Sequence, residues 1–431
     1  MMEMKWIRAH AEQIQQAANH KGIDFSVREL LEWDDRRKKY QLECEELRRL
    51  RNEGAVKASV LLAEGKEAEA AELKTTSKRV NKALKESSKR WEEAVQEVAK
   101  LVLLSPNVVS EDTPIGSSEE DNVEIRRVGR TPEWSFMPRD HVELGRLHDM
   151  LDVPRGVKAG GSRSYYLKGT GVLLHRAVQQ LAFDLLTERG FTPMEVPLLL
   201  KEQPFVHSGY FPAGQNQSFY IEDEEKWLAG TSEVPLISYY GGDVLDLSEP
   251  LRLVSVSNCF RSEVGSAGRD VKGLYRVHQF AKVEMVVLCQ PDPELSEQML
   301  QEITSHAEEL LTLLELAYRV MSVCTGDMSA RTYKQYDIET WMPSRGSYGE
   351  THSSSNLHSF QSRRANIRCL SEQGHPVHCH TLNNTAVASP RILIPLLENH
   401  QAEDGSIYIP KALRKYVGGK ERFNIPKMGT L

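Results

Sequence analysis

One short stretch of the sequence combines three arginines with three glycines. They are Arg261, Arg269, Arg276, Gly265, Gly268 and Gly273. Apolar runs at 251–260 and 283–288 flank this stretch, so it predicts two strands joined by a polar loop. Glycine lets the backbone approach a ligand closely, and a guanidinium group binds phosphate oxygens in pairs. The stretch therefore predicts a hairpin that binds a triphosphate, and a solvated hairpin with scattered basic residues is the alternative.

The order of residues in this hairpin narrows the interpretation. FRSE at 260–263 precedes the loop, and RVHQF at 276–280 and KVEM at 282–285 follow it. This order resembles the second motif of the class II aminoacyl-tRNA synthetases, in the form found in the seryl-tRNA synthetase family of bacteria and organelles. The Walker pattern Gly-x-x-x-x-Gly-Lys-Ser/Thr is absent from the sequence, so a P-loop is not expected to bind the nucleotide.

The resemblance implies that the hairpin binds ATP. On the matching positions Arg261 would stabilise the α-phosphate, Arg276 would orient the outer phosphates and Phe280 would stack on adenine. The hairpin residues implied to bind ATP are Arg261, Ser262, Glu263, Arg276, Val277 and Phe280.

A Thr-Ser-Glu sequence enters an apolar run within WLAGTSEVPL at 227–236. Such a sequence is also a common helix N-cap. In the family the equivalent segment lines the amino-acid pocket, and the resemblance implies a set of serine-binding residues. They are Thr231, Ser232, Glu233, Glu284 and Thr385. Carboxylates and hydroxyls suit the ammonium and hydroxyl groups of serine.

A strand predicted at 333–341 is followed by the Ser-rich segment YGETHSSSNLHSFQSRR at 348–364. Such a segment is often only flexible, but it resembles a family signature that binds Mg²⁺ and the triphosphate through Glu350 and Ser353. A carboxylate and a hydroxyl are oxygen donors that Mg²⁺ accepts. Thr351 and His352 are also implied to contact ATP, although the family commonly has small hydroxyl or aliphatic residues there. A histidine here could titrate near neutrality, but we expect His352 to face solvent.

The segment 380–401, HTLNNTAVASPRILIPLLENHQ, is interpreted as a loop leading into an apolar helix. It resembles the third class II motif, whose arginine, here Arg391, binds the γ-phosphate. Thr385, Ala386 and Ala388 replace the usual small glycines. The implied catalytic residues are therefore Arg261, Arg276 and Arg391.

The elements that must position these residues begin with a long helical region. Residues 26–104 are rich in Glu, Lys, Arg, Ala and Leu and carry two imperfect heptad seams. Gly54 and Gly65 both offer a break, and a tip near Gly65 gives two helices of nearly equal length, each about 50 Å. Heptads alone favour a dimerisation coiled coil or a surface helix pair, whereas the resemblance implies an antiparallel coiled-coil arm that binds tRNA.

We expect three regions: an N-terminal helical arm domain at 1–104, a Pro/Gly-rich linker at 105–138 and a class II catalytic domain at 139–431. The fold class is α+β, with an antiparallel sheet flanked by helices. A helix at 171–189 should end at Gly190, and the following FTPMEVP resembles the first class II motif, which implies a homodimer. A second amphipathic helix is expected at 293–318.

Composition limits the alternatives. The 431 residues carry a net charge of −7, so this is not a generally basic nucleic-acid binder, and RNA contacts would need local basic stripes. The six cysteines form neither a Cys-x-x-Cys pair nor a regular pattern. No apolar run is long enough to span a bilayer, so we expect a cytoplasmic protein without a membrane partner.

The resemblance implies that L-serine reacts with ATP and Mg²⁺ to form seryl-adenylate, and that serine is then transferred to tRNA(Ser), with tRNA(Sec) as a second candidate. Two other functions stay open. One is an aminoacyl ligase that loads a carrier protein, and the other is a non-catalytic synthetase-like regulatory protein.

Overall fold

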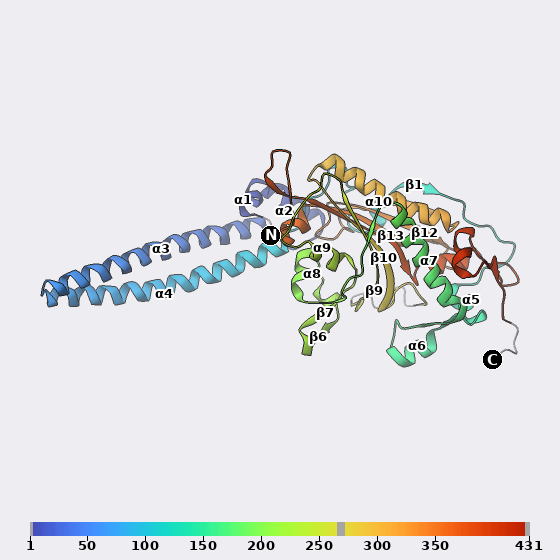
Figure 1. Ribbon diagram of the computed structural model, residues 1–431, viewed down its shortest axis with the longest axis horizontal. Helices are drawn as coiled ribbons and strands as arrows, with labels where there is room; N and C mark the ends of the chain where they lie inside the picture. The colour runs from blue at the N-terminus through green and yellow to red at the C-terminus, as the bar shows by residue number, and fades with distance from the viewer. Residues whose placement is uncertain (1–2, 265–271, 427–431) are drawn as a thin grey trace. The chain divides into compact units, whose positions relative to one another are not determined.

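The computed structural model describes residues 3–264 and 272–426, which form two compact units (Figure 1). One unit comprises Met1–Asn19 and Ile23–Pro106, and the other comprises His20–Gly22 and Asn107–Leu431. The predicted hairpin loop residues Gly265, Gly268 and Arg269 lie outside the described residues. No helix in the part of the chain that the structure describes is both long and apolar enough to cross a membrane.

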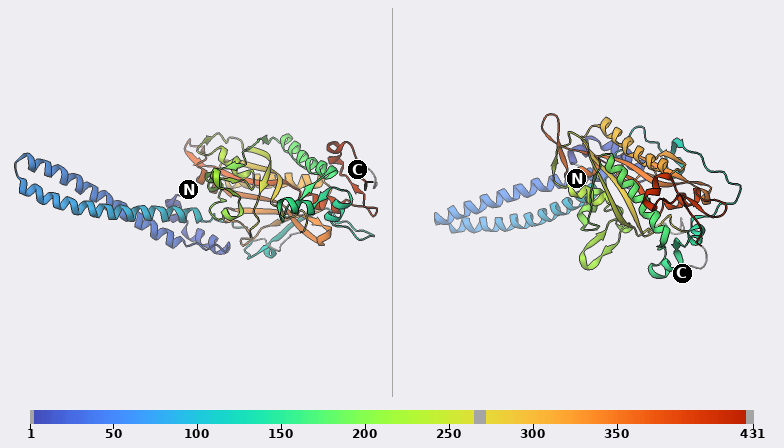
Figure 2. Two further views of the ribbon diagram at one scale, coloured as in Figure 1. Left: turned by 90° about the horizontal axis from the view of Figure 1, so that it is seen from below. Right: turned by 45° about the vertical axis from the view of Figure 1, so that its right-hand side comes forward.

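The first unit is helical. Its elements are α1 (Met4–Ala9), α2 (Ala11–His20), α3 (Val27–Ala63) and α4 (Glu67–Leu104). Figures 1 and 2 show α3 and α4 side by side along their length, as an antiparallel pair. The side chain of Ser26 caps α3 by accepting a hydrogen bond from the Glu29 amide, at 3.2 Å.

The turn between the two long helices lies at Gly65, whose φ of +77° is a conformation that glycine adopts without strain. The predicted tip is therefore confirmed, and Gly54 lies inside α3. The buried seam contains residues of both predicted heptad series, and the thiol of Cys44 donates to Ser87 Oγ at 3.3 Å. The coiled-coil pattern correctly predicted which faces of α3 and α4 meet.

The second unit is built on an eight-stranded sheet with the order β1-β11-β12-β13-β16-β10-β9-β4. The strands are β1 (Val123–Val128), β4 (Thr192–Pro193), β9 (Leu251–Phe260), β10 (Gln279–Cys289), β11 (Tyr318–Ser322), β12 (Lys334–Met342), β13 (Ser347–His358) and β16 (His380–Ser389). All neighbours are antiparallel except β4 and β9. This is the antiparallel sheet expected for the α+β fold class.

The longer helices of this unit are α7 (Gly169–Glu188) and α10 (Pro293–Leu313), and both contribute to the main apolar core. Strand β10 shows how the sheet divides its two faces. Val283, Met285 and Val287 point into this core, whereas Val286 and Leu288 belong to a second core that includes residues of α9 (Glu233–Tyr239). Alternation with a period of two leaves the even-numbered residues at the start of β10 on the face opposite α7 and α10.

Shorter elements surround the sheet. The helices are α5 (His141–Leu147), α6 (Val153–Gly160), α8 (Glu202–Ser208), α11 (Phe360–Ala365) and α12 (Leu393–Asn399). The small sheets are β2 (Leu151–Asp152) with β3 (Tyr166–Leu167), β5 (Leu199–Leu200) with β7 (Lys226–Leu228) and β6 (Tyr220–Ile221), β8 (Val244–Leu245) with β14 (Arg368–Leu370) and β15 (Pro376–His378), and β17 (Ile407–Tyr408) with β18 (Arg422–Phe423).

Three predicted elements differ from the structure. The helix expected at 293–318 ends at Leu313, because Tyr318 begins strand β11. The segment starting at His380 is not a loop, since it forms strand β16, which pairs with β10 on one side and with β13 on the other. Strand β1 lies inside the segment expected to be a linker and forms one edge of the large sheet. Its six residues are too short a run to stand out between turn-forming neighbours.

Candidate active site

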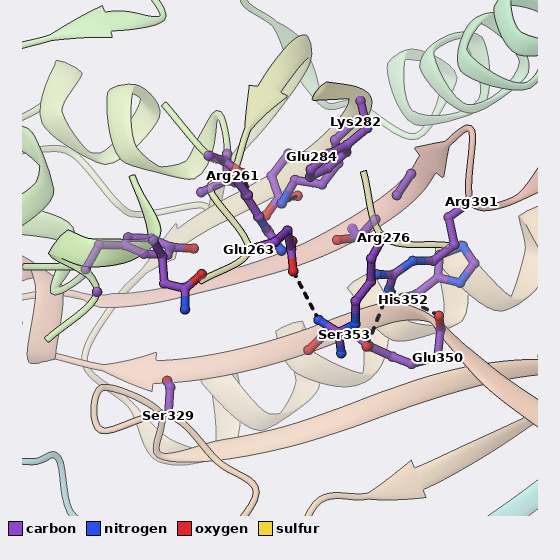
Figure 3. Close-up of a pocket in the computed structure, with 18 of the residues that line it drawn as sticks. Arg261, Glu263, Arg276, Lys282, Glu284, Ser329, Glu350, His352, Ser353 and Arg391 are labelled. Carbon is purple, nitrogen blue, oxygen red and sulfur yellow. Dashed lines mark hydrogen bonds and ion pairs between the residues drawn. The ribbon is translucent and has the colours of Figure 1, made fainter. Parts of the chain in front are cut away.

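A cavity of about 760 Å³ opens on the face of the large sheet that carries the even-numbered residues of β10 (Figure 3). It is lined by most of the predicted site residues: Thr231, Arg261, Glu263, Arg276, Val277, Phe280, Glu284, Glu350, Thr351, His352, Ser353, Thr385 and Arg391. Residues that are distant in sequence thus come together at one place. Ser232, Glu233 and Ser262, which the structure also describes, are not among the lining residues.

Arg261 stands at the end of β9 and turns back over β10. The centre of its guanidinium group lies 5.2 Å from the centroid of the Phe280 ring, and its Nε donates to the carbonyl oxygen of Gly230 at 3.3 Å. Phe280 is on β10, directly opposite Cys259 of β9. The arginine therefore lies beside an aromatic surface on which a nucleotide base can stack.

Arg276 and Glu263 come from the two ends of the hairpin loop and form an ion pair, with 3.3 Å between Nη1 and Oε2. Glu263 has a φ of +52°, in the left-handed region that residues with a side chain rarely adopt. Such strained backbone is found preferentially at functional sites.

Arg391 follows β16 and contacts Glu350 of β13. Its Nη1 lies 3.4 Å from Glu350 Oε2, and its Nε donates to the carbonyl oxygen of Tyr275 at 3.1 Å. The Glu350 side chain is 45% exposed, so its oxygens remain accessible to a ligand. Three arginines and an accessible carboxylate thus line the same cavity.

The strand that carries Glu350 has a bulge, and this bulge explains the wrong prediction for His352. Ile338 pairs with His352 and Glu339 pairs with Glu350, so Thr351 is an extra residue between them. His352 is only 1% exposed and does not face solvent. Burial, together with a smaller effect of the nearby Arg391, lowers the pKa of His352 to about 4, so the ring is neutral at pH 7.

Ser353 is the second predicted metal ligand, and it lies on β13 opposite Asp337 of β12. The Ser353 hydroxyl hydrogen-bonds to the Asp337 carboxyl. Burial and the charge of Glu350 raise the pKa of Asp337 well above its usual value. Thr351, by contrast, has its hydroxyl hydrogen-bonded to Thr340 Oγ1 at 2.7 Å, inside the sheet.

Glu284 lies deep in the cavity on β10, and its neighbour on β16 is Thr385. Its Oε2 is 2.6 Å from Lys282 Nζ, and its Oε1 accepts a hydrogen bond from Asn383 Nδ2 at 3.2 Å. Burial nevertheless raises the pKa of Glu284. A buried carboxylate next to a threonine hydroxyl is suited to bind a small ligand that offers hydroxyl or ammonium donors.

Comparison with known proteins identifies the family. Residues 1–109 match the seryl-tRNA synthetase N-terminal domain, and residues 219–400 match the class II tRNA synthetase core domain (G, H, P, S and T). The serine–tRNA ligase of Deinococcus radiodurans is 42% identical over 99% of this chain and 100% of its own length. The chain belongs to the seryl-tRNA synthetase family.

Two further relatives agree. The serine–tRNA ligase of Borreliella burgdorferi is 40% identical over 97% of this chain and 98% of its own. The crystal structure of seryl-tRNA synthetase from Pyrococcus horikoshii complexed with ATP aligns with a TM-score of 0.89 at 35% identity, covering 99% of this chain and 100% of that chain. The predicted resemblance and the predicted fold class are thereby confirmed.

Within this synthetase fold, Glu233 is placed differently from the other predicted serine-binding residues. It is fully buried, Oε1 accepts from Arg331 Nη1 and from Gln361 Nε2, and Oε2 accepts from the Tyr210 hydroxyl at 2.8 Å. Burial alone would raise the pKa of Glu233, but Arg331 and Tyr210 outweigh it and lower the pKa. The Glu233 carboxylate is therefore engaged by protein donors.

Sequence reasoning missed Arg331 and Tyr210, which both line the cavity. Arg331 Nη2 donates to the Tyr210 hydroxyl at 2.8 Å, and the guanidinium centre lies 4.1 Å from the tyrosine ring centroid. Arg331 lies three residues before the start of β12, and its carboxylate partner is 98 residues earlier in the chain. No local pattern marks such a pair.

Proposed function

We propose that this protein activates L-serine with ATP and joins it to the 3′ end of tRNA(Ser), as a serine–tRNA ligase. The observation that carries the proposal is that Arg261, Arg276 and Arg391 line the same cavity as the buried Glu284. The arginines provide positive charge for a triphosphate, and the carboxylate provides an acceptor for a small amino acid.

In the first step, a carboxylate oxygen of serine attacks the α-phosphorus of ATP. A new P–O bond forms, the bond to the β-phosphate oxygen breaks, and pyrophosphate leaves with the electron pair. This displacement requires alignment and charge neutralisation and no protein nucleophile. Arg261 would stabilise the charge on the α-phosphate, while Arg276 and Arg391 would orient the β- and γ-phosphates.

The rest of the nucleotide fits the hairpin. Phe280 would stack on adenine, and Glu263 and Val277 would contact the nucleotide. Ser262, Thr351 and His352 are the weaker part of this assignment, because Ser262 Oγ donates to the Asn216 carbonyl at 2.7 Å and Thr351 is bonded inside the sheet. For His352 we propose a neutral ring that fills the wall of the cavity beside Arg391.

Mg²⁺ is the metal that the residues fit. Glu350 provides an accessible carboxylate and Ser353 a hydroxyl on the same strand, and Mg²⁺ usually binds one or two protein oxygens together with substrate phosphates. In the described residues, no three His, Cys, Asp or Glu side chains gather into a metal-binding group. When bound, Mg²⁺ would neutralise phosphate charge. Glu350 and Ser353 would hold it beside Arg391.

Serine selection is assigned to the deep end of the cavity. Glu284, Thr231 and Thr385 would bind the ammonium and hydroxyl groups directly. The burial of Glu284 and Thr231 makes an unmatched ligand costly. Glu233 would act behind them, by holding Tyr210 and Arg331 in place. Ser232, which is fully buried, would shape the turn before α9.

In the second step, a terminal ribose hydroxyl of the tRNA attacks the carbonyl carbon of seryl-adenylate. Its proton is lost, the ester forms and AMP leaves. We assign tRNA binding to the helical arm domain at 1–104, and catalysis to 139–431, with 105–138 connecting them. A second substrate of the same chemistry is tRNA(Sec).

A homodimer and a cytoplasmic location complete the proposal. The segment that resembles the first class II motif, with Pro193, Met194 and Glu195, lines a second cavity of about 580 Å³ together with α7 residues such as Phe183. A concave, partly apolar surface on these elements supports self-association through this face.

The decisive experiment is pyrophosphate exchange with each amino acid in turn, followed by transfer to tRNA or to a carrier protein. Serine-dependent exchange with transfer to tRNA supports the proposal. Exchange with transfer only to a carrier protein would identify a carrier-loading ligase, and no exchange with any amino acid would identify a non-catalytic protein.

A further inference from the structure

A buried histidine outside the cavity touches the backbone of the hairpin that enters it. His141 is the first residue of α5 and is only 6% exposed. Its Nδ1 lies 2.8 Å from Glu398 Oε1, and the backbone amide of Leu274 lies 3.2 Å from its Nε2. Both ring nitrogens are therefore engaged, one by a carboxylate on α12 and the other by the hairpin.

These two contacts determine which nitrogen carries the proton. A backbone amide can only donate, so Nε2 must be the acceptor. Nδ1 then carries the hydrogen and donates to Glu398. The arrangement requires a neutral ring of one tautomer, and the carboxylate selects it.

Glu398 is itself held as an acceptor. It is fully buried, and it receives the backbone amide of His141 at 2.9 Å as well as the amide and hydroxyl of Ser344 at 2.9 and 2.8 Å. Each of these groups donates, so an ionised carboxylate satisfies them all. The carboxylate thereby ties α5, α12 and the turn after β12 to one another.

The hairpin is shaped to admit the histidine. A Cβ atom on Gly273 would lie 2.0 Å from His141 Nε2, so this position has no room for a side chain. Gly273 also has a φ of +71°. On either side, Lys272 forms an ion pair with Asp140, the N-cap residue of α5, and Leu274 donates to His141. Three consecutive residues are thus fixed to the start of α5.

The fixed residues lead directly into the cavity. Tyr275 follows Leu274, and its carbonyl oxygen accepts from Arg391 Nε at 3.1 Å. Its hydroxyl donates to the carbonyl oxygen of Glu350 at 3.3 Å. Arg276, which pairs with Glu263, is the next residue. A shift of the Leu274 amide therefore moves groups that hold Arg391 and Arg276.

We propose that His141, with its tautomer set by Glu398, is a positioning residue for the ATP site. It anchors the segment Gly273–Leu274, and this anchor sets the positions of Tyr275 and Arg276 relative to Arg391 and Glu350. The inference rests on the proposed assignment of these arginines to ATP. Loss of the His141 anchor should therefore raise the KM for ATP more than the KM for serine, because the residues proposed to bind serine lie outside the segment that His141 anchors.

The test compares two variants of His141 with a matched control. In His141→Asn the side-chain amide can still donate to Glu398, but no group reaches the Leu274 amide. His141→Ala removes both contacts. The control is His148→Ala, at the C-cap of the same helix. There the lost contact of a buried ring is with the Gly405 carbonyl at 2.7 Å, and neither residue lines the cavity.

In serine-dependent pyrophosphate exchange, H141N should raise the KM for ATP about tenfold, the effect of one lost buried hydrogen bond. The KM for serine should change less than twofold. Glu398→Gln should have the same selective effect, because the glutamine NH2 group would face groups of His141 and Ser344 that are themselves hydrogen-bond donors. H148A should lower the melting temperature without changing the ratio of the two KM values.

A double-mutant cycle provides an independent readout. Gly273→Ala should impair ATP binding severely in the wild-type background. It should impair it less in the H141A background, because the ring that its Cβ meets is gone. Equal effects in both backgrounds would count against the anchor.

The outcomes separate this inference from the proposed function. If R391A abolishes exchange but folded H141N keeps a wild-type KM for ATP, the positioning role is wrong and the ATP site stands. If R391A retains full exchange, the ATP site is wrong and this inference falls with it. If all His141 variants lose activity only in proportion to their melting temperature, as H148A does, the role of His141 is structural and the inference is overturned.

Discussion

Arg391 and Glu350 form an ion pair at the wall of the cavity, with 3.4 Å between Nη1 and Oε2 and a second contact of 3.3 Å from Nη1 to the Glu350 carbonyl. We assign these two side chains to different partners, the γ-phosphate and Mg²⁺. In the structure each of these charges neutralises the other. If both assignments hold, ATP and its metal would each offer one of these side chains a partner of opposite charge.

The first prediction concerns the α-phosphate. Arg261→Ala removes the guanidinium group beside Phe280 and should reduce serine-dependent pyrophosphate exchange by at least about 100-fold, the usual effect of losing one donor that stabilises transition-state charge. Arg189→Ala is a suitable control, since Arg189 forms a surface ion pair with Glu309. Near wild-type exchange in R261A would refute the assignment of this arginine.

The second prediction concerns amino-acid selectivity. Alanine leaves the hydrogen-bonding groups of the buried Glu284 and of Thr385 unmatched. Threonine satisfies them and is excluded only by the size of its extra methyl group. We therefore expect alanine to be rejected more strongly than threonine when kcat/KM is measured for each in pyrophosphate exchange. A preference for alanine over threonine would mean that these residues do not bind the serine hydroxyl.

The third prediction concerns the buried pair of Glu233 and Arg331. Arg331→Ala leaves a carboxylate with no exposed surface and without its cation, and should cost about 3–5 kcal/mol of unfolding free energy at pH 7. It should also raise the KM for serine, because Tyr210 loses one of its two partners in this network. Chemical denaturation and exchange kinetics measure the two effects.

The pH dependence of the unfolding free energy of R331A, compared with that of the wild type, tests the pairing of Glu233 with Arg331. In the wild type, the pKa of Glu233 is lowered, so its contribution to stability is present above the unfolded pKa and is lost as pH falls through the folded pKa. Without Arg331, burial should raise the folded pKa above the unfolded value. The unfolding free energy of R331A should then increase as pH is lowered from 7 to 5, relative to wild type. The same pH slope in both proteins would contradict the pairing.

The fourth prediction concerns a histidine away from the cavity. His175 on α7 lies with Nδ1 2.7 Å from Ser389 Oγ, and burial lowers its pKa to about 4. A histidine whose folded pKa is below the unfolded value destabilises the fold as pH falls below the unfolded pKa, because only the unfolded chain takes up the proton. His175→Gln should therefore reduce the loss of unfolding free energy between pH 7 and pH 5. An unchanged slope in denaturation curves would show that the ring is accessible to protons.

The sequence predicted the large elements because each has a local cause. Gly65 predicted the correct position of the turn between the two arm helices. The apolar runs at 251–260 and 283–288 predicted β9 and the second half of β10. Most of the predicted site residues line the cavity. They could be predicted from the sequence because each belongs to a motif whose residues are contiguous.

What could not be predicted depends on contacts between distant segments. The exposure of His352 depends on a bulge that appears only when β13 is paired with β12. The pairs Glu233–Arg331 and His141–Glu398 join residues 98 and 257 positions apart. A buried charge needs a partner, but the sequence does not say which residue supplies it.

The last prediction concerns the helical arm. Residues proposed to bind ATP, Mg²⁺ and serine all belong to the second compact unit, whereas α3 and α4 belong to the first. Replacing 28–103 by a short flexible connection should therefore leave serine-dependent pyrophosphate exchange within a few-fold of the full-length rate. It should nearly abolish transfer of serine to tRNA, if the arm binds tRNA as we propose.

The basis for this expectation is the charge of the outer arm. Lysines on α4 are largely exposed, among them Lys78, Lys82, Lys85 and Lys89, and contacts between lysine and RNA phosphate weaken as salt rises because counterions are released on binding. The matched control for the deletion is the full-length protein in which these four lysines are changed to glutamine: it keeps the coiled coil, and it should lose tRNA affinity and show a shallower salt dependence. A truncated protein that still charges tRNA at close to the full-length rate would mean that the arm is only a structural coiled coil.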